Sequence, residues 1–231
     1  MTARELRAYC IFGGIKMERA AVFIDGGYWQ KILKNRFGSP KIDLVAFSDA
    51  LCGSQERLRT YFYDCLPFQG DSPSDEEKEL YRRKQSYLHA LGLLPRFEVR
   101  HGRLARRNIN FKEVERPNGS TFFLACSDAD PAYDPKNIVV KFEQKGIDTL
   151  VGIDVTGLSV RRSIATVILV AGDSDFIPSM RVAKDEGMLL RLVYHDSAIH
   201  RDLIQLADDR FLLTREFIQN VTVSAKVKTA P

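Results

Sequence analysis

The stretch ILVAGDSDF, residues 168–176, passes from four apolar residues through a glycine into two carboxylates that flank a serine. A short apolar run with turn residues directly after it is typical of a strand buried in a parallel sheet. Ligands of such sheets bind outside the carboxyl ends of the strands. Asp173 and Asp175 are therefore expected at the edge of the sheet where a ligand would bind.

A second junction of the same kind occurs early in the chain. The apolar stretch AAVFID (20–25) ends in Asp25 and is followed by Gly26 and Gly27. If the two strands are neighbours, Asp25 and Asp173 converge, and gathered carboxylates repel each other unless they are neutralised. A hard divalent cation such as Mg²⁺ is typically held by a few carboxylates, waters and substrate phosphates, and it activates water for attack on a phosphate. The pattern thus predicts a site for Mg²⁺ or Mn²⁺.

Two other interpretations of these acids stay open. An aspartate at a strand–helix junction is often only a helix N-cap, and this applies to Asp173 and its neighbour Ser174. Two acidic junctions, each after an apolar strand, favour the metal site over capping alone. Aspartyl-phosphate phosphatases also carry acids at strand ends, but their second aspartate lies two residues after the first, where this chain has Gly27.

The segment QKGIDTLVGIDV (144–155) offers a third acid. Asp148 falls in the first turn of a predicted helix, where the helix dipole favours a negative charge. Asp154 lies six residues on and points about 120° away on a regular helix, so the two cannot reach one point equally well. We therefore prefer Asp148 as the third ligand. Lys145 is either a phosphate-binding residue or a solvated surface lysine.

Apolar stretches of strand type alternate with stretches of helical spacing along most of the chain, which predicts an α/β domain with a mostly parallel sheet. The clearest helix signal is a capping box formed by Ser74 and Glu77, with Gly92 at the helix end. We expect an N-terminal extension (1–19), one domain (20–217) with a hairpin-like insertion around 108–143, and a C-terminal tail (218–231). Helices are predicted at 28–37, 42–52, 74–92, 145–162, 174–187 and 197–209, and strands at 20–25, 59–65, 96–104, 165–172, 188–195 and 211–214.

The composition excludes several classes of protein. Of the 231 residues, 45% are hydrophobic and 28% charged, which is ordinary for a globular protein, and a net charge of +4 is compatible with nucleic-acid binding without indicating it. There is no apolar run of about 18 residues to cross a membrane and no long apolar core of a signal peptide, so a cytoplasmic protein without membrane contact is expected. The four cysteines form no CxxC pair, which favours free thiols.

Basic and aromatic residues suggest where a nucleic acid would bind. The stretch RFEVRHGRLARR (96–107) holds five arginines, among them Arg100, Arg103 and Arg106. Such a strand either follows a phosphate backbone or is a solvated edge strand, and both interpretations stay open. Tyr28 either stacks on a base or belongs to the core.

Three stretches together resemble the motifs of a known family. VFIDGGYW (22–29), QKGIDTLVGID (144–154) and VAGDSDFIPSMRVAKDEG (170–187) are similar to those of the NYN domain, in particular to the LabA-like group of bacterial proteins within the PIN-like nuclease superfamily. RDLIQLADDRFLL (201–213) resembles the closing helix and strand of that family. The motifs follow the order of the family, and the resemblance covers residues 20–215.

The resemblance implies a three-layer α/β/α PIN-like fold and metal-dependent hydrolysis of phosphodiester bonds in RNA, with single-stranded RNA as the expected partner. It implies metal-binding acids at Asp25, Asp148, Asp173 and Asp175, with Asp154 as an additional one. Many members carry Asn where this chain has Tyr28. The residues expected to contact substrate are Tyr28, Lys145, Ser174, Arg100, Arg103 and Arg106.

Two alternatives belong to other functional classes. A non-catalytic RNA- or protein-binding regulatory module could use the same fold, although such a module has no reason to keep repelling carboxylates together. A small-molecule phosphatase or nucleotide-binding regulator is disfavoured because the glycines at 13–14 and 26–27 lack the spacing of a phosphate-binding loop. The sequence leaves open whether the chain forms a homo-oligomer.

Overall fold

The computed structural model describes residues 18–70, 72–115, 121–126 and 138–223, and describes side chains except within 106–143. The chain divides into two compact units. The first contains Met1–Asp64, Leu88–Arg100 and Ile147–Pro231, and the second contains Cys65–Tyr87 and His101–Gly146. Nearly all of the expected N-terminal extension and the last eight residues of the expected tail lie outside the described residues.

The first unit is built on a parallel sheet, as the alternation of strands and helices predicts. Strand β1 (Arg19–Asp25) lies between β2 (Glu56–Cys65) and β6 (Thr166–Val170). Beyond β6 follow β7 (Leu189–Tyr194) and β8 (Asp209–Leu212), both parallel to their neighbours. The carboxyl ends of β1 and β6 are therefore adjacent, so the condition for convergence of the two acidic junctions is met.

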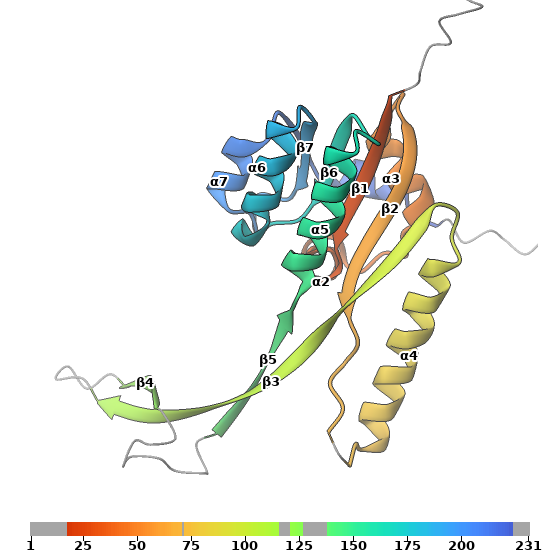
Figure 1. Ribbon diagram of the computed structural model, residues 1–231. Helices are drawn as coiled ribbons and strands as arrows, with labels where there is room; N and C mark the ends of the chain where they lie inside the picture. Colours follow the sequence, from red (N-terminus) through yellow and green to blue (C-terminus); the bar gives the residue numbers. More distant parts are fainter. Residues whose placement is uncertain (1–17, 71, 116–120, 127–137, 224–231) are drawn as a thin grey trace, which may run out of the picture. The chain divides into compact units, whose positions relative to one another are not determined.

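Helices cover both faces of this sheet and give the expected three-layer α/β/α arrangement (Figure 1). α2 (Gly26–Phe37) and α3 (Leu44–Cys52) lie on one face. α5 (Ile147–Val160), α6 (Ile177–Asp185) and α7 (Arg201–Leu206) lie on the other. A short 3-10 turn, η2 (Ser174–Phe176), leads from β6 into α6.

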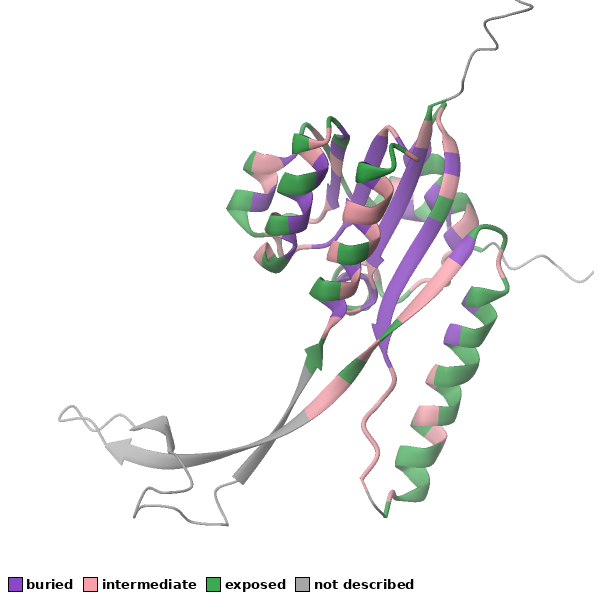
Figure 2. Cartoon of the chain, viewed as in Figure 1, coloured by how far each residue is buried: buried purple, intermediate pink, exposed green. Residues whose placement is uncertain are grey.

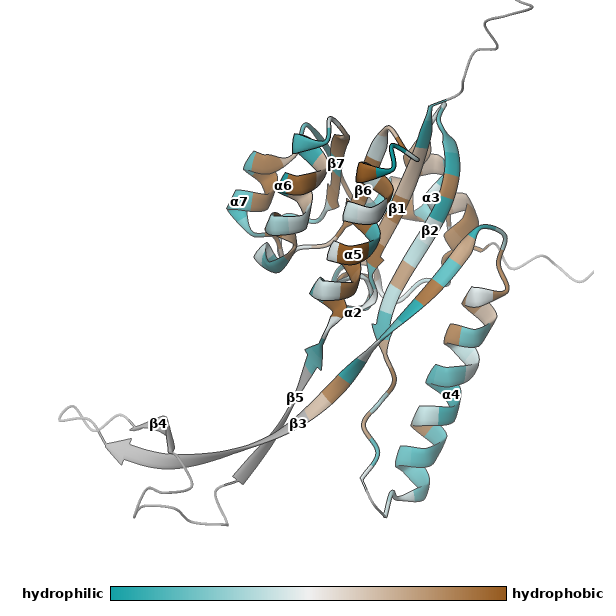
Figure 3. Ribbon diagram, viewed as in Figure 1, coloured by the Kyte–Doolittle hydropathy of each residue, from teal (hydrophilic) through white to brown (hydrophobic). Residues whose placement is uncertain are grey.

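The buried strands supply the core between the layers. Every residue of β6 is buried, as are the five central residues of β1 (Figure 2). Figure 3 shows that apolar residues dominate these strands and β7. Burial of continuous apolar runs explains why these segments form central parallel strands, since both of their faces are covered by helices.

A short final helix, α8 (Arg215–Asn220), was not expected from the sequence. The expected domain boundary at residue 217 falls inside it, and Ile218 is only 2% exposed. The N–H of Asp43 donates to the carbonyl of Val221 at 2.8 Å, which ties this end of the chain to the start of α3. Six residues carry too few apolar positions to reveal a helical period, which is why the pattern was missed.

The second unit contains antiparallel pairs. Strand β3 (Phe97–Glu115), which begins in the first unit, pairs antiparallel with β4 (Thr121–Cys126) and with β5 (Ile138–Lys145). Helix α4 (Asp75–Gly92) begins in this unit at the predicted capping box. The N–H of Glu77 donates to Ser74 Oγ at 3.2 Å, and the N–H of Ser74 donates to Glu77 Oε2 at 2.9 Å.

Within the described ranges, every helix is too short or too polar to cross a lipid bilayer.

Candidate functional site

The two strand-end aspartates both serve as helix caps. Asp25 precedes α2, and its Oδ1 accepts hydrogen bonds from the N–H groups of Gly27 at 2.9 Å and Tyr28 at 3.2 Å. Asp173 precedes η2, and its Oδ1 accepts from the N–H of Asp175 at 3.2 Å. These caps use Oδ1 of each carboxylate, so capping and ligand binding are compatible roles for both residues.

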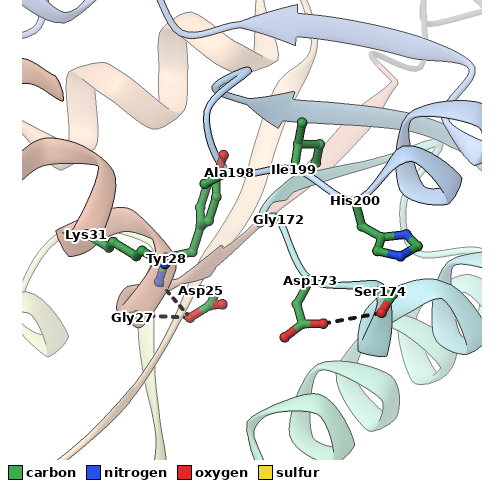
Figure 4. A pocket seen from close by; sticks show the side chains of 10 residues that line it. All are labelled: Asp25, Gly27, Tyr28, Lys31, Gly172, Asp173, Ser174, Ala198, Ile199 and His200. Atoms are coloured by element: carbon green, nitrogen blue, oxygen red, sulfur yellow. Dashed lines mark hydrogen bonds between the residues drawn. The ribbon is translucent and has the colours of Figure 1, made fainter. Parts of the chain in front are cut away.

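Asp25 and Asp173 line one pocket of about 450 Å³. Figure 4 shows their carboxylates pointing toward one another across it. Three segments that are distant in sequence form its walls, namely the start of α2, the turn after β6 and the loop between β7 and α7. The lining residues are Asp25, Gly27, Tyr28, Lys31, Gly172, Asp173, Ser174, Ala198, Ile199 and His200.

Tyr28 holds in place the loop 195–200, which forms one wall of this pocket. Its side chain is buried, and its hydroxyl oxygen accepts a hydrogen bond from the N–H of His195 at 2.9 Å. Burial raises the pKa of Tyr28 to about 12, so the hydroxyl stays neutral. At the far end of the loop, the N–H of His200 donates to the carbonyl of Gly172 at 2.9 Å. The loop 195–200 is thus fixed at both ends by residues of the predicted motifs.

Gly172 permits the close approach of this loop. A Cβ atom at this position would lie 2.3 Å from the carbonyl oxygen of Ala198 and 2.5 Å from Cε2 of Tyr28. We therefore expect Gly172→Ala to displace the loop and to lower the free energy of unfolding by about 1–3 kcal/mol, measured by urea denaturation. Gly152→Ala on α5 is the control, because its added Cβ would meet Ser179 Cβ at an ordinary 3.7 Å. Equal stability of the two variants would contradict this account.

The surroundings of Asp25 shift the pKa of its carboxyl group. The pKa of its carboxyl is raised to about 6, chiefly by burial and also by the negative charges of Asp64 and Asp173, against the opposing effect of the N–H bonds from Tyr28 and Gly27. A carboxyl group perturbed by burial and by like charges in a pocket is a typical feature of a functional site.

Asp64 is an acid that the sequence interpretation missed. It is the second-to-last residue of β2, is 3% exposed, and accepts a hydrogen bond from Gln30 Nε2 at 2.8 Å. It also lies against the start of α2, where a Cβ atom on Gly26 would come within 2.8 Å of its Oδ2. The signal was present, because Asp64 lies one residue before the end of the strand RTYFYDC (59–65), and Asp25 likewise stands at the end of its own strand. Three adjacent strands, β2, β1 and β6, thus each bring an acid to the same edge of the sheet.

The other expected acids lie elsewhere. Asp148 is exposed in the first turn of α5, and Asp175 is exposed within η2, so neither lines the pocket, although α5 packs against η2. Asp154 accepts hydrogen bonds from Tyr63 Oη at 3.0 Å and from Arg100 Nε at 3.0 Å. Asp154 and Arg100, a candidate metal ligand and a candidate phosphate contact, therefore form an ion pair with each other.

The remaining basic candidates belong to the second unit. Lys145, exposed at the end of β5, stands opposite Arg103 of β3 in the antiparallel register. Arg106 lies opposite Phe142 in the same pairing, and its side chain is outside the described portion. Ser174, by contrast, lines the pocket, with its Oγ 3.4 Å from Asp173 Oδ1.

The side chains that face the pocket offer oxygen ligands, which suit a hard cation. In the described part of the chain, no group of three or more His, Cys, Asp or Glu side chains is already arranged to hold a metal ion. Asp25 and Asp173 nevertheless face each other with carboxylate oxygens, the ligand type that Mg²⁺ and Mn²⁺ prefer, and Asp64 adds negative charge beside them.

Comparisons with known proteins agree with this architecture. A family model, the NYN domain, matches residues 19–214 of the chain. A crystal structure of a protein of unknown function from Vibrio parahaemolyticus RIMD 2210633 is similar with a TM-score of 0.50 and 16% sequence identity, over 90% of this chain and 99% of that one. At this identity the likeness concerns the fold alone. No curated protein matches the chain in sequence.

Proposed function

The chain belongs to the NYN domain family, part of the PIN-like nuclease superfamily, and from this premise we propose that it is a metal-dependent ribonuclease of the LabA-like branch. The observation that carries the proposal is the pair of carboxylates of Asp25 and Asp173, which face each other in one pocket at the carboxyl edge of the sheet. Like charges that face each other at close range are costly, and their retention is explained if they serve to bind a cation.

In this proposal Asp25 and Asp173 hold Mg²⁺ or Mn²⁺, with Asp148 and Asp175 as further ligands and Asp154 as an additional one. Such an ion supplies an activated water and stabilises the negative charge that develops on the phosphate. The chain itself orients the ligands, because backbone N–H groups hold Oδ1 of Asp25 and of Asp173 in place. The negative charge of the buried Asp64 acts on Asp25 and increases the affinity of the site for positive charge.

A second candidate function is a non-catalytic RNA- or protein-binding regulatory module. It is favoured by one observation, namely that Asp154 is paired with Arg100 while Asp148 and Asp175 lie outside the pocket lining. A binding module would require only the pocket and basic surfaces, and not a complete set of ligands.

The deciding experiment is incubation of the purified protein with labelled single-stranded RNA, with Mg²⁺, with Mn²⁺ and with EDTA. A ribonuclease cleaves the RNA only in the presence of an ion, and single-stranded DNA of the same sequence tests the choice of sugar. RNA that is bound but stays intact under all conditions would support the binding module instead.

A separate prediction concerns the arginines of β3 and the affinity of the protein for RNA. Replacing Arg103 and Arg106 with Gln should weaken RNA binding and reduce the slope of log K against log salt by about 0.7 for each lost phosphate contact with a single strand. Arg100 is left unchanged, because its loss would leave Asp154 without its ion pair. The slope is measured by fluorescence anisotropy at several salt concentrations. An unchanged slope would show that Arg103 and Arg106 make no phosphate contacts and are only solvated side chains.

A further inference from the structure

Two basic side chains line the pocket beside the facing carboxylates and have no role in the function proposed above. Lys31 comes from α2, and His200 comes from the loop between β7 and α7. Figure 4 shows them on either side of Asp25 and Asp173. A phosphodiester that approaches two carboxylates is repelled by them, so its binding requires positive charge or hydrogen-bond donors in the same pocket.

We propose that Lys31 and His200 bind the phosphate oxygens of RNA and hold a phosphodiester next to Asp25 and Asp173. This inference rests on the proposed function, because it assigns the substrate to the same pocket. It adds two substrate-binding residues that the sequence motifs do not indicate.

Lys31 is placed for this role by the helix that Asp25 caps. Lys31 lies four residues after Gly27 and three after Tyr28 on α2, so it is a surface neighbour of both, and all three line the pocket. Among the lining residues, all of them in the described part of the chain, Lys31 carries the one permanent positive charge. Its side chain is exposed, and no described acid forms a salt bridge with it. A lysine ammonium in this situation attracts a phosphate as a point charge.

His200 is placed by two hydrogen bonds. Its N–H donates to the carbonyl of Gly172 at 2.9 Å, which holds it beside the turn that carries Asp173. Its Nδ1 accepts from the N–H of Asp202 at 3.4 Å and so caps α7. A neutral imidazole whose Nδ1 accepts a hydrogen bond carries its proton on Nε2. With Nδ1 engaged in this cap, Nε2 is the ring nitrogen that can donate a hydrogen bond to a ligand.

The test uses a short fluorescein-labelled single-stranded RNA and fluorescence anisotropy without metal. All proteins carry Asp173→Asn, so that the RNA is not cleaved. Lys31→Gln should weaken binding about tenfold and lower the salt slope by about 0.7, because one charged phosphate contact is lost. His200→Ser keeps an N-cap for α7 and should weaken binding roughly three- to tenfold, with little change in the slope.

Lys34→Gln is the matched control, because it makes the same charge change on the same helix at a residue that does not line the pocket. Its effect should be smaller than that of Lys31→Gln, and Lys31→Arg should restore most of the affinity. Circular dichroism checks that each variant is folded.

The outcomes separate this inference from the proposed function. If the wild-type protein cleaves RNA but Lys31→Gln and His200→Ser bind it as Lys34→Gln does, the phosphate contacts are refuted and the ribonuclease proposal stands. If both variants lose affinity as expected but the wild-type protein cleaves nothing with either ion, the contacts are supported and the ribonuclease proposal fails. Absence of RNA binding in the parent protein would overturn the inference.

Discussion

Asp25→Asn is expected to cleave RNA roughly a hundredfold or more slowly than the wild-type protein, and at neutral pH to be more stable without metal. Cleavage falls because an amide holds a divalent cation less well than a carboxylate does. Stability rises because Asn keeps an oxygen for the N–H groups of Gly27 and Tyr28 while the half-buried negative charge is removed.

The stability effect should depend on pH in a defined direction. Burial, together with Asp64 and Asp173, raises the pKa of Asp25 from its ordinary 3.8 to about 6. The folded protein therefore binds this proton more tightly than the unfolded chain, so the carboxyl's contribution to stability is present below about pH 4 and is lost as the pH rises to about 6. The gain in Asp25→Asn should grow across that window and reach about 2–3 kcal/mol above it, since each pKa unit corresponds to about 1.4 kcal/mol.

Denaturant unfolding of the metal-free protein at several pH values between about 4 and 8 measures this difference. Asp43→Asn is the matched control, because Asp43 caps α3 with its Oδ1 at 3.0 Å from the N–H groups of both Val45 and Ala46, at an exposed position away from the pocket. The control should change neither the pH dependence nor the cleavage. A pH-independent difference for Asp25→Asn would show that the pKa of Asp25 is not raised.

Asp173→Asn is the second variant with a large expected effect. If Asp173 were only the cap of η2, Asn would serve about as well, and neither stability nor cleavage would change much. If it holds the ion, cleavage at saturating Mn²⁺ should fall by orders of magnitude, roughly 10²-fold or more. The metal-free protein should also melt at a higher temperature, because Asp25 then has one charge fewer facing it.

A spectroscopic measurement separates this charge effect from a general disturbance of the fold. The negative charge of Asp173 is one of the causes that raise the pKa of Asp25, so the pKa of Asp25 followed by NMR should be lower in Asp173→Asn than in the wild-type protein. Wild-type cleavage rates in this variant would refute the catalytic role of the acidic turn after β6.

Several features of this protein depend only on residues that are close together in the sequence. The buried strands β1 and β6 were predicted because a continuous apolar run followed by a turn needs no information from elsewhere in the chain. The capping box of Ser74 and Glu77 was predicted for the same reason, since its partners are three residues apart. The convergence of Asp25 and Asp173 was expected only if their strands were neighbours, and the structure places β1 beside β6 with both residues in one pocket.

The partners of the other polar residues could not be predicted in this way. Asp154 pairs with Arg100, 54 residues away, and Tyr28 accepts a hydrogen bond from His195, 167 residues away. Asp64 joins the acidic edge because β2 lies beside β1 in the sheet. The sequence by itself therefore determined most of the elements and the acids Asp25 and Asp173 at strand ends, because hydrophobic period and capping act over a few residues. Only the tertiary structure decided which acids face the pocket and which are neutralised, because strand order and packing bring together side chains that no local pattern connects.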